Sequence, residues 1–152
     1  MRRKLLAVAL SALAAGAMAT AVPAEAVPLQ SGNYGVYPNE GKYPEQTGAK
    51  FRLVATRAVN HRGRRVTMKV FYNGRIGTFA RIDNAPRDCV VVVDRTPGNQ
   101  QITGVVGESV DPGISFAYTR IANNLQGRLA RGALICEDAQ GTSIVLARSN
   151  FF

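Results

Sequence analysis

The sequence predicts an all-β protein: a single compact antiparallel β-sandwich or partly closed barrel of about eight short strands. Apolar and polar residues alternate over short stretches, turn residues separate these stretches about every 8–14 positions, and no stretch repeats with the period of a helix. Two cysteines in a chain with an export signal add a covalent constraint. We expect a signal peptide at residues 1–26, an irregular arm at 27–49 and one β-domain at 50–152.

The first residues indicate export. Arg2, Arg3 and Lys4 form a basic start, and residues 5–19 are apolar or small. Two Ala-x-Ala cleavage sites follow, Ala17-Met18-Ala19 and Ala24-Glu25-Ala26. Cleavage after Ala26 is preferred because the composition changes there, and cleavage after Ala19 is the alternative. The apolar run is short for a membrane span and no other stretch is longer, so we expect a secreted protein without a transmembrane segment.

The arm at residues 27–49 is rich in glycine and proline, which disrupt regular strand pairing, and it also carries Tyr34, Tyr37 and Tyr43. These tyrosines suggest that the arm lies across the domain. Two roles are open for them: an aromatic platform for a polysaccharide or a base, or a cover over one edge of the core. The second role is the more common one and is preferred.

Strand and turn signals alternate through the β-domain. Strands are expected at 51–59, 65–72, 89–93, 101–106, 114–121, 128–136 and 143–147, with a further strand after residues 73–74. Asn73-Gly74 predicts a two-residue type I′ hairpin, which would place Met68 opposite Phe79 and Lys69 opposite Thr78. Gly132 is expected to form a β-bulge.

The segment Cys89–Val93 is the most β-prone stretch in the chain. Its four consecutive valines disfavour a helix and predict a strand that is buried on both faces. We expect Cys89 to form a disulfide with Cys136, at the end of a later strand. Closing a loop of about 48 residues should stabilise the fold by roughly 3–4 kcal/mol on the chain-entropy model.

Catalytic residues are scarce. His61 is the only histidine; its basic neighbours disfavour the imidazolium, and we expect a solvated turn residue. The serines lack a Gly-x-Ser-x-Gly elbow, and no Cys/His spacing predicts a metal site or a cofactor. Four acids at strand ends or turns are candidate glycosidase carboxylates: Asp94, Asp111, Glu137 and Asp138. Their spacing adds no support, so we expect a protein that is not an enzyme.

Basic residues cluster around the first hairpin. Arg57, Arg62, Arg64, Arg65 and Lys69 lie within a short stretch, and Arg75 and Arg81 follow on the next hairpin. If Arg65 and Lys69 share the solvent face of their strand, the turn and that face form a cationic patch. Such a patch attracts anionic wall polymers, membrane surfaces or nucleic acid, although no motif for specific nucleic-acid recognition is present. An ordinary solvated basic face is the alternative.

Several short motifs resemble the spore-associated protein A family, which comprises small secreted proteins of filamentous spore-forming bacteria. They are Val70-Phe71-Tyr72-Asn73, Asp88-Cys89-Val90-Val91-Val92, Thr96-Pro97-Gly98, Val110-Asp111-Pro112-Gly113 and Ala130-Arg131-Gly132 with Cys136. The resemblance covers about residues 66–143. It implies a location at the cell envelope or spore surface, and it brings no established catalytic residues.

The favoured function is therefore that of a secreted, non-enzymatic protein of the cell or spore surface that binds anionic envelope polymers through the basic patch. Its oligomeric state is left open. A different class is an inhibitor of extracellular proteases or other hydrolases, which would present the loop Asp83-Asn84-Ala85-Pro86-Arg87. A third is a small secreted hydrolase, which requires a pocket that gathers two carboxylates about 5–10 Å apart.

Overall fold

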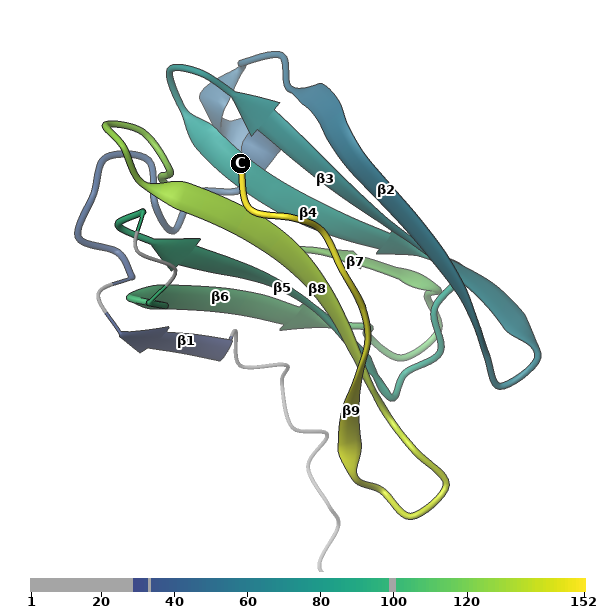
Figure 1. Cartoon of the computed structure of the whole chain (residues 1–152). Coiled ribbons are helices and arrows are strands. Elements are labelled where there is room, and N and C mark those ends of the chain that lie inside the picture. The colour runs from purple at the N-terminus through teal and green to yellow at the C-terminus, as the bar shows by residue number, and fades with distance from the viewer. Residues whose placement is uncertain (1–28, 33, 99–100) are drawn as a thin grey trace, which may run out of the picture.

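The protein is a β-sandwich of two antiparallel sheets (Figure 1). The computed structural model describes residues 29–32, 34–98 and 101–152. One sheet has the strand order β1-β6-β5-β8-β9 and the other β2-β3-β4-β7. The elements are β1 Leu29–Gly32, a 3₁₀ helix Pro44–Thr47, β2 Arg52–His61, β3 Arg64–Asn73, β4 Gly77–Asp83, β5 Cys89–Thr96, β6 Gly104–Ser109, β7 Phe116–Tyr118, β8 Leu129–Glu137 and β9 Ser143–Arg148. The all-β prediction is confirmed, and the two sheets do not close into a barrel.

Residues 1–28 lie outside the described part of the chain, and so does the predicted signal peptide. No helix in the described residues is long and apolar enough to cross a membrane. The predicted arm differs from expectation at one place. Leu29–Gly32 forms β1, an edge strand that pairs with β6, so this stretch is not irregular.

The core lies between the sheets and follows the alternation of the strands. The buried apolar residues include Val66, Met68, Val70, Ala80, Ile82, Val91, Val93, Val106 and Leu134. In β3 the alternate residues between these positions point to the outer face of the four-stranded sheet, as the sequence pattern predicts.

Gly132 is not a bulge. It pairs in regular register with Val93, and the register shift in β8 falls between Leu134 and Ile135 on the side of β9. A Cβ atom at Gly132 would lie 2.5 Å from Val70 Cγ2, on the opposite sheet. The glycine is needed because the two sheets approach closely at this point.

The hairpin between β3 and β4 also differs from the prediction. Asn73 pairs with Gly77 and Met68 with Ile82, so residues 74–76 form the loop and the expected register is wrong. The Asn73 side chain explains the longer turn: its Oδ1 accepts a hydrogen bond from Arg75 N at 2.8 Å, and its Nδ2 donates to Lys50 O at 2.7 Å. The positive φ falls on Gly77 and not on Gly74.

Two other predicted strands have shifted bounds. The strand expected at 101–106 is β6 at Gly104–Ser109, and the strand expected at 114–121 shortens to β7 at Phe116–Tyr118. Beyond β7 the pairing with β4 is interrupted: Thr119 N still donates to Ala80 O and Ala122 pairs with Thr78, but between them Ile121 N donates to Lys42 O in the arm.

The valine strand β5 is the centre of the five-stranded sheet, between β6 and β8, and nearly all of it is buried. Cys89 lies directly opposite Cys136 on β8, with a Cα–Cα distance of 4.0 Å, and the two form the predicted disulfide. The covalent bond therefore fixes one end of the central strand pair.

The opposite end of β5 is held by an ion pair that the sequence did not suggest. Arg95 Nε lies 2.9 Å from Glu40 Oε1, and the two side chains are only 1% and 0% exposed. Glu40 also accepts hydrogen bonds from the backbone N–H groups of Gly35, Tyr37 and Asn123. One carboxylate of the arm thus joins the arm, the β7–β8 connection and the central strand.

We predict that Glu40→Gln lowers the free energy of unfolding by about 3–5 kcal/mol, because it removes the carboxylate charge that pairs with the buried Arg95 guanidinium. Denaturant unfolding of the oxidised protein measures this loss. Glu137→Gln removes an exposed acid at the end of β8 and is the matched control. Similar unfolding midpoints for the two variants would contradict the assigned role of the ion pair.

Candidate anion-binding groove

The structure separates the five basic residues proposed from the sequence. Arg65 and Lys69 share the outer face of β3, as the strand period predicts. Arg57 pairs with the buried Met68 and so lies on the other face of the sheet, where its Nη1 donates to Thr56 O at 2.9 Å. Arg57 therefore does not join the outer-face cations.

Part of this charge is neutralised. Asp83 on β4 binds both Lys69, at 3.0 Å from Nζ, and Arg81, at 2.6 Å from Nε. Burial by itself would raise the pKa of Asp83, but hydrogen bonds and charge attraction from Arg81 and Lys69 outweigh it and lower the pKa. The outer face of the sheet is thus a charge network rather than an open cationic patch.

A groove lies at the end of the sandwich beside the β2–β3 turn. It has a volume of about 750 Å³. Its walls come from that turn, from the β4–β5 loop and from the loop before β7, and they consist of Arg62, Arg64, Pro86, Arg87, Asp88, Gly113, Ile114, Ser115 and Phe116. Three arginines therefore face one concave surface.

Asp88 holds the groove together. Its Oδ2 lies 2.9 Å from His61 Nε2 and 2.8 Å from Arg62 Nε, and the Asp88 side chain is 14% exposed. Arg62 adopts a positive φ of 47° in the tight turn, and its Nη2 also donates to Asp138 O. Arg62 thus matches the charge of Asp88, whereas Arg64 and Arg87 have no carboxylate partner in the described parts of the chain.

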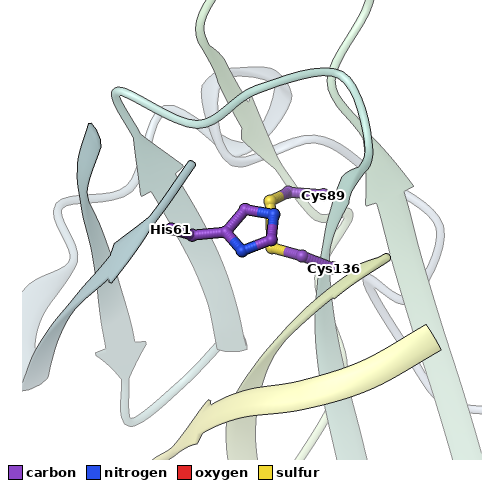
Figure 2. A group of neighbouring side chains, drawn as sticks. All are labelled: His61, Cys89 and Cys136. Atoms are coloured by element: carbon purple, nitrogen blue, oxygen red, sulfur yellow. A yellow bond between two sulfur atoms is a disulfide. The ribbon is translucent and has the colours of Figure 1, made fainter. Parts of the chain in front are cut away.

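His61 is not the solvated turn residue that the sequence predicts. Its side chain is 11% exposed and lies against the disulfide, so that its ligand atom and the two sulfur atoms are all within 4.8 Å of one another (Figure 2). The two sulfurs are bonded to each other, and His61 Nε2 lies 2.9 Å from Asp88 Oδ2. The role of His61 in the oxidised protein is to cover the disulfide and to orient Asp88.

The sequence placed Arg87 in the candidate inhibitor loop and did not group it with the basic residues of the β2–β3 turn. Arg87 lies in the β4–β5 loop, far along the chain from the β2–β3 turn, and only the pairing of the sheets brings the two together. The sequence did place Arg87 in a turn just before the central strand β5, but it gave no sign that this turn lies beside the β2–β3 turn.

The three tyrosines of the arm face the domain. Tyr34 Oη donates to Ile121 O at 2.6 Å, and burial is the main cause that raises its pKa to about 12. The Tyr37 ring lies under the guanidinium groups of Arg95 and Arg128, and Tyr43 Oη donates to Glu108 at 3.2 Å. These contacts favour the role of covering the core edge.

The exposed aromatic surface lies elsewhere, on the outer face of the four-stranded sheet. Phe71 and Phe79 stack on each other across β3 and β4, and Phe116 and Tyr118 lie along β7. The strand period was a signal for this surface: Phe71 follows the buried Val70 and must point the other way.

The four carboxylates proposed from the sequence are not gathered in one place. Asp94 binds Arg131 at 2.8 Å, and Glu137 and Asp138 lie at the β8–β9 end. Asp111, however, shares a smaller hollow of about 240 Å³ with Glu108, a residue that the sequence did not single out. Burial is the largest cause that raises the pKa of Glu108, while a hydrogen bond from Tyr43 acts against it.

Comparison of the chain with protein-family models, with curated proteins and with solved structures finds no match. The function is therefore argued from the geometry.

We predict that Asp83→Asn lowers the free energy of unfolding by more at pH 7 than at pH 2. The pKa of Asp83 is lower in the folded state than in the unfolded state, so its ion pairs stabilise the fold above the unfolded pKa of about 3.9. This contribution is lost as the pH falls through the folded-state pKa. Denaturant unfolding at the two pH values measures it, with Glu137→Gln as a control for net charge; equal losses at both pH values would contradict the sign.

Proposed function

We propose that this protein binds anionic polymers of the cell or spore surface in the groove lined by Arg62, Arg64 and Arg87. The observation that carries the proposal is the presence of three arginines on one concave surface, two of them without a carboxylate partner in the described residues. The proposal keeps Arg62 and Arg64 from the basic stretch predicted from the sequence and adds Arg87. It leaves out Arg57, Arg65 and Lys69, which do not line the groove.

Arginine suits this task because its planar guanidinium can donate two parallel hydrogen bonds to a carboxylate or phosphate. The net charge is +9 for the whole sequence and +7 without residues 1–26, and such a charge would draw a polyanion toward the protein from a distance. Arg62 balances the charge of Asp88, so the attraction for an anion comes from Arg64 and Arg87.

An extracellular setting fits the same proposal. The disulfide is compatible with an oxidising compartment, and the sequence of residues 1–26 has the pattern of an export signal. Secretion, surface association and membership of the spore-associated protein A family all stand as parts of the proposal.

The loop proposed for an inhibitor is less suited to its role. An inhibitory loop must project into the active site of its target, whereas Ala85 is fully buried and its N–H donates to Ser115 O at 2.8 Å. Asn84 is also tied back, since its Nδ2 donates to Arg65 O at 3.2 Å.

We predict that the double variant Arg64→Gln/Arg87→Gln weakens binding to polyphosphate by roughly tenfold, equivalent to about 1.4 kcal/mol, at low salt. Binding should also fall steeply as salt is added. The matched control is Arg57→Gln/Arg148→Gln, which removes the same charge from exposed positions outside the groove. Equal weakening by the two variants would show attraction by net charge alone and would overturn the groove.

A second candidate function is hydrolysis of a bound polysaccharide by Glu108 and Asp111. The observation that favours it is that one hollow holds both carboxyl groups and that the pKa of Glu108 is raised, as a general acid requires. We predict that, if this is the activity, Glu108→Gln abolishes the release of reducing ends from polygalacturonate and peptidoglycan. Release that is absent from the unaltered protein, or unchanged in the variant, would rule this function out.

A further inference from the structure

A second hollow, of about 600 Å³, lies on the outer face of the four-stranded sheet. Its lining includes Phe71, Phe79, Arg81, Phe116 and Tyr118, with Glu45 at one side. The volume falls within the usual range for sites that bind small molecules or short stretches of polymer. Phe116 is 36% exposed, and among the described residues no segment covers this aromatic surface.

The aromatic side chains form two pairs with a cation between them. The Phe71 and Phe79 rings are stacked, with centroids 4.8 Å apart, and the Phe116 and Tyr118 rings are parallel at 6.5 Å. Arg81 pairs with Tyr118 across β4 and β7, and its guanidinium lies 4.8 Å from the centre of the Phe116 ring. Ring surfaces and hydrogen-bonding groups are therefore interleaved.

The charges around the hollow balance one another. Arg81 and Lys69 are held by Asp83, and Glu45 accepts a hydrogen bond from Tyr118 Oη at 3.0 Å. Because no excess of cations remains, this hollow is not suited to an isolated anion. The excess charge lies in the arginine groove, which shares Phe116 with the hollow.

We propose that the hollow binds the pyranose rings of an acidic polysaccharide whose carboxylates bind in the arginine groove. A pyranose has apolar C–H faces that pack on aromatic rings and a rim of hydroxyls that pair with groups such as Arg81 and Glu45. The continuity of the two sites through Phe116 supports a polymer that carries rings and charges together. This inference rests on the proposed function and names its substrate class.

Single-stranded nucleic acid also combines rings with charge, but it fits the hollow less well. Sugar hydroxyls can donate hydrogen bonds to the Glu45 carboxylate, whereas the phosphates of a nucleic acid offer acceptors only. The Phe71 and Phe79 rings are moreover stacked on each other with centroids 4.8 Å apart, so a base cannot insert between them.

The test compares three polymers by titration calorimetry with the oxidised protein: polygalacturonate, polyphosphate and oligo-deoxythymidine. We expect Phe71→Ala, at a residue that lines the hollow and not the arginine groove, to weaken polygalacturonate binding by at least fivefold and to change polyphosphate binding by less than twofold. Leu53→Ala is the matched control, since Leu53 is an exposed apolar residue on the same outer face, opposite Phe71, that does not line the hollow. Ring-proton shifts of the aromatic residues in the unaltered protein provide a readout that does not depend on the folding of a variant.

Each outcome decides one of the two proposals. If Arg64→Gln/Arg87→Gln weakens polygalacturonate binding and Phe71→Ala does not, the anion groove stands and the sugar hollow is overturned. If Phe71→Ala weakens polygalacturonate binding while the arginine variant has no effect on any polymer, the hollow stands and the proposed groove fails. Tighter binding of oligo-deoxythymidine than of polygalacturonate, with dependence on Phe71, would overturn the polysaccharide in favour of nucleic acid.

Discussion

The buried ion pair between Glu40 and Arg95 is the constraint on which the rest of the structure depends. Two charges removed from water are costly unless each finds its partner and its hydrogen bonds, and here the Glu40 carboxylate meets Arg95 and three backbone N–H groups. The guanidinium fills the space beside Gly104, where a Cβ atom would collide with it. The arm is thereby part of the domain, although its composition is typical of a loose segment.

The central strand β5 links this ion pair to the candidate site. Arg95 is near one end of the strand, and Cys89, next to Asp88, begins the other. The disulfide and the His61 ring lie side by side there (Figure 2). Asp88 binds both His61 and Arg62. The β2–β3 turn is held against the β4–β5 loop in this way, which places Arg64 and Arg87 on the same groove.

The aromatic residues divide into two groups with different roles. The tyrosines of the arm point toward the domain and bind it through hydrogen bonds and cation–π contacts. The phenylalanines Phe71, Phe79 and Phe116 point away from the core. The sequence left two roles open for the tyrosines, an aromatic platform or a cover over the core edge, and their contacts favour the cover. The strand period directs Phe71 to the outer face of the sheet.

The sequence by itself determined the fold class, the central valine strand and the disulfide, because each depends on local periodicity or on residue type in a chain whose first residues have the pattern of an export signal. The register at Asn73 required knowledge of a side chain that bonds to the distant backbone of Lys50. The need for a glycine at position 132 depends on the approach of Val70 from the other sheet. Only the tertiary structure decided that Arg62, Arg64 and Arg87 line one groove and that His61 is buried beside Asp88. Arg87 and Asp88 reach the β2–β3 turn through the packing of the two sheets and not through nearness in the chain.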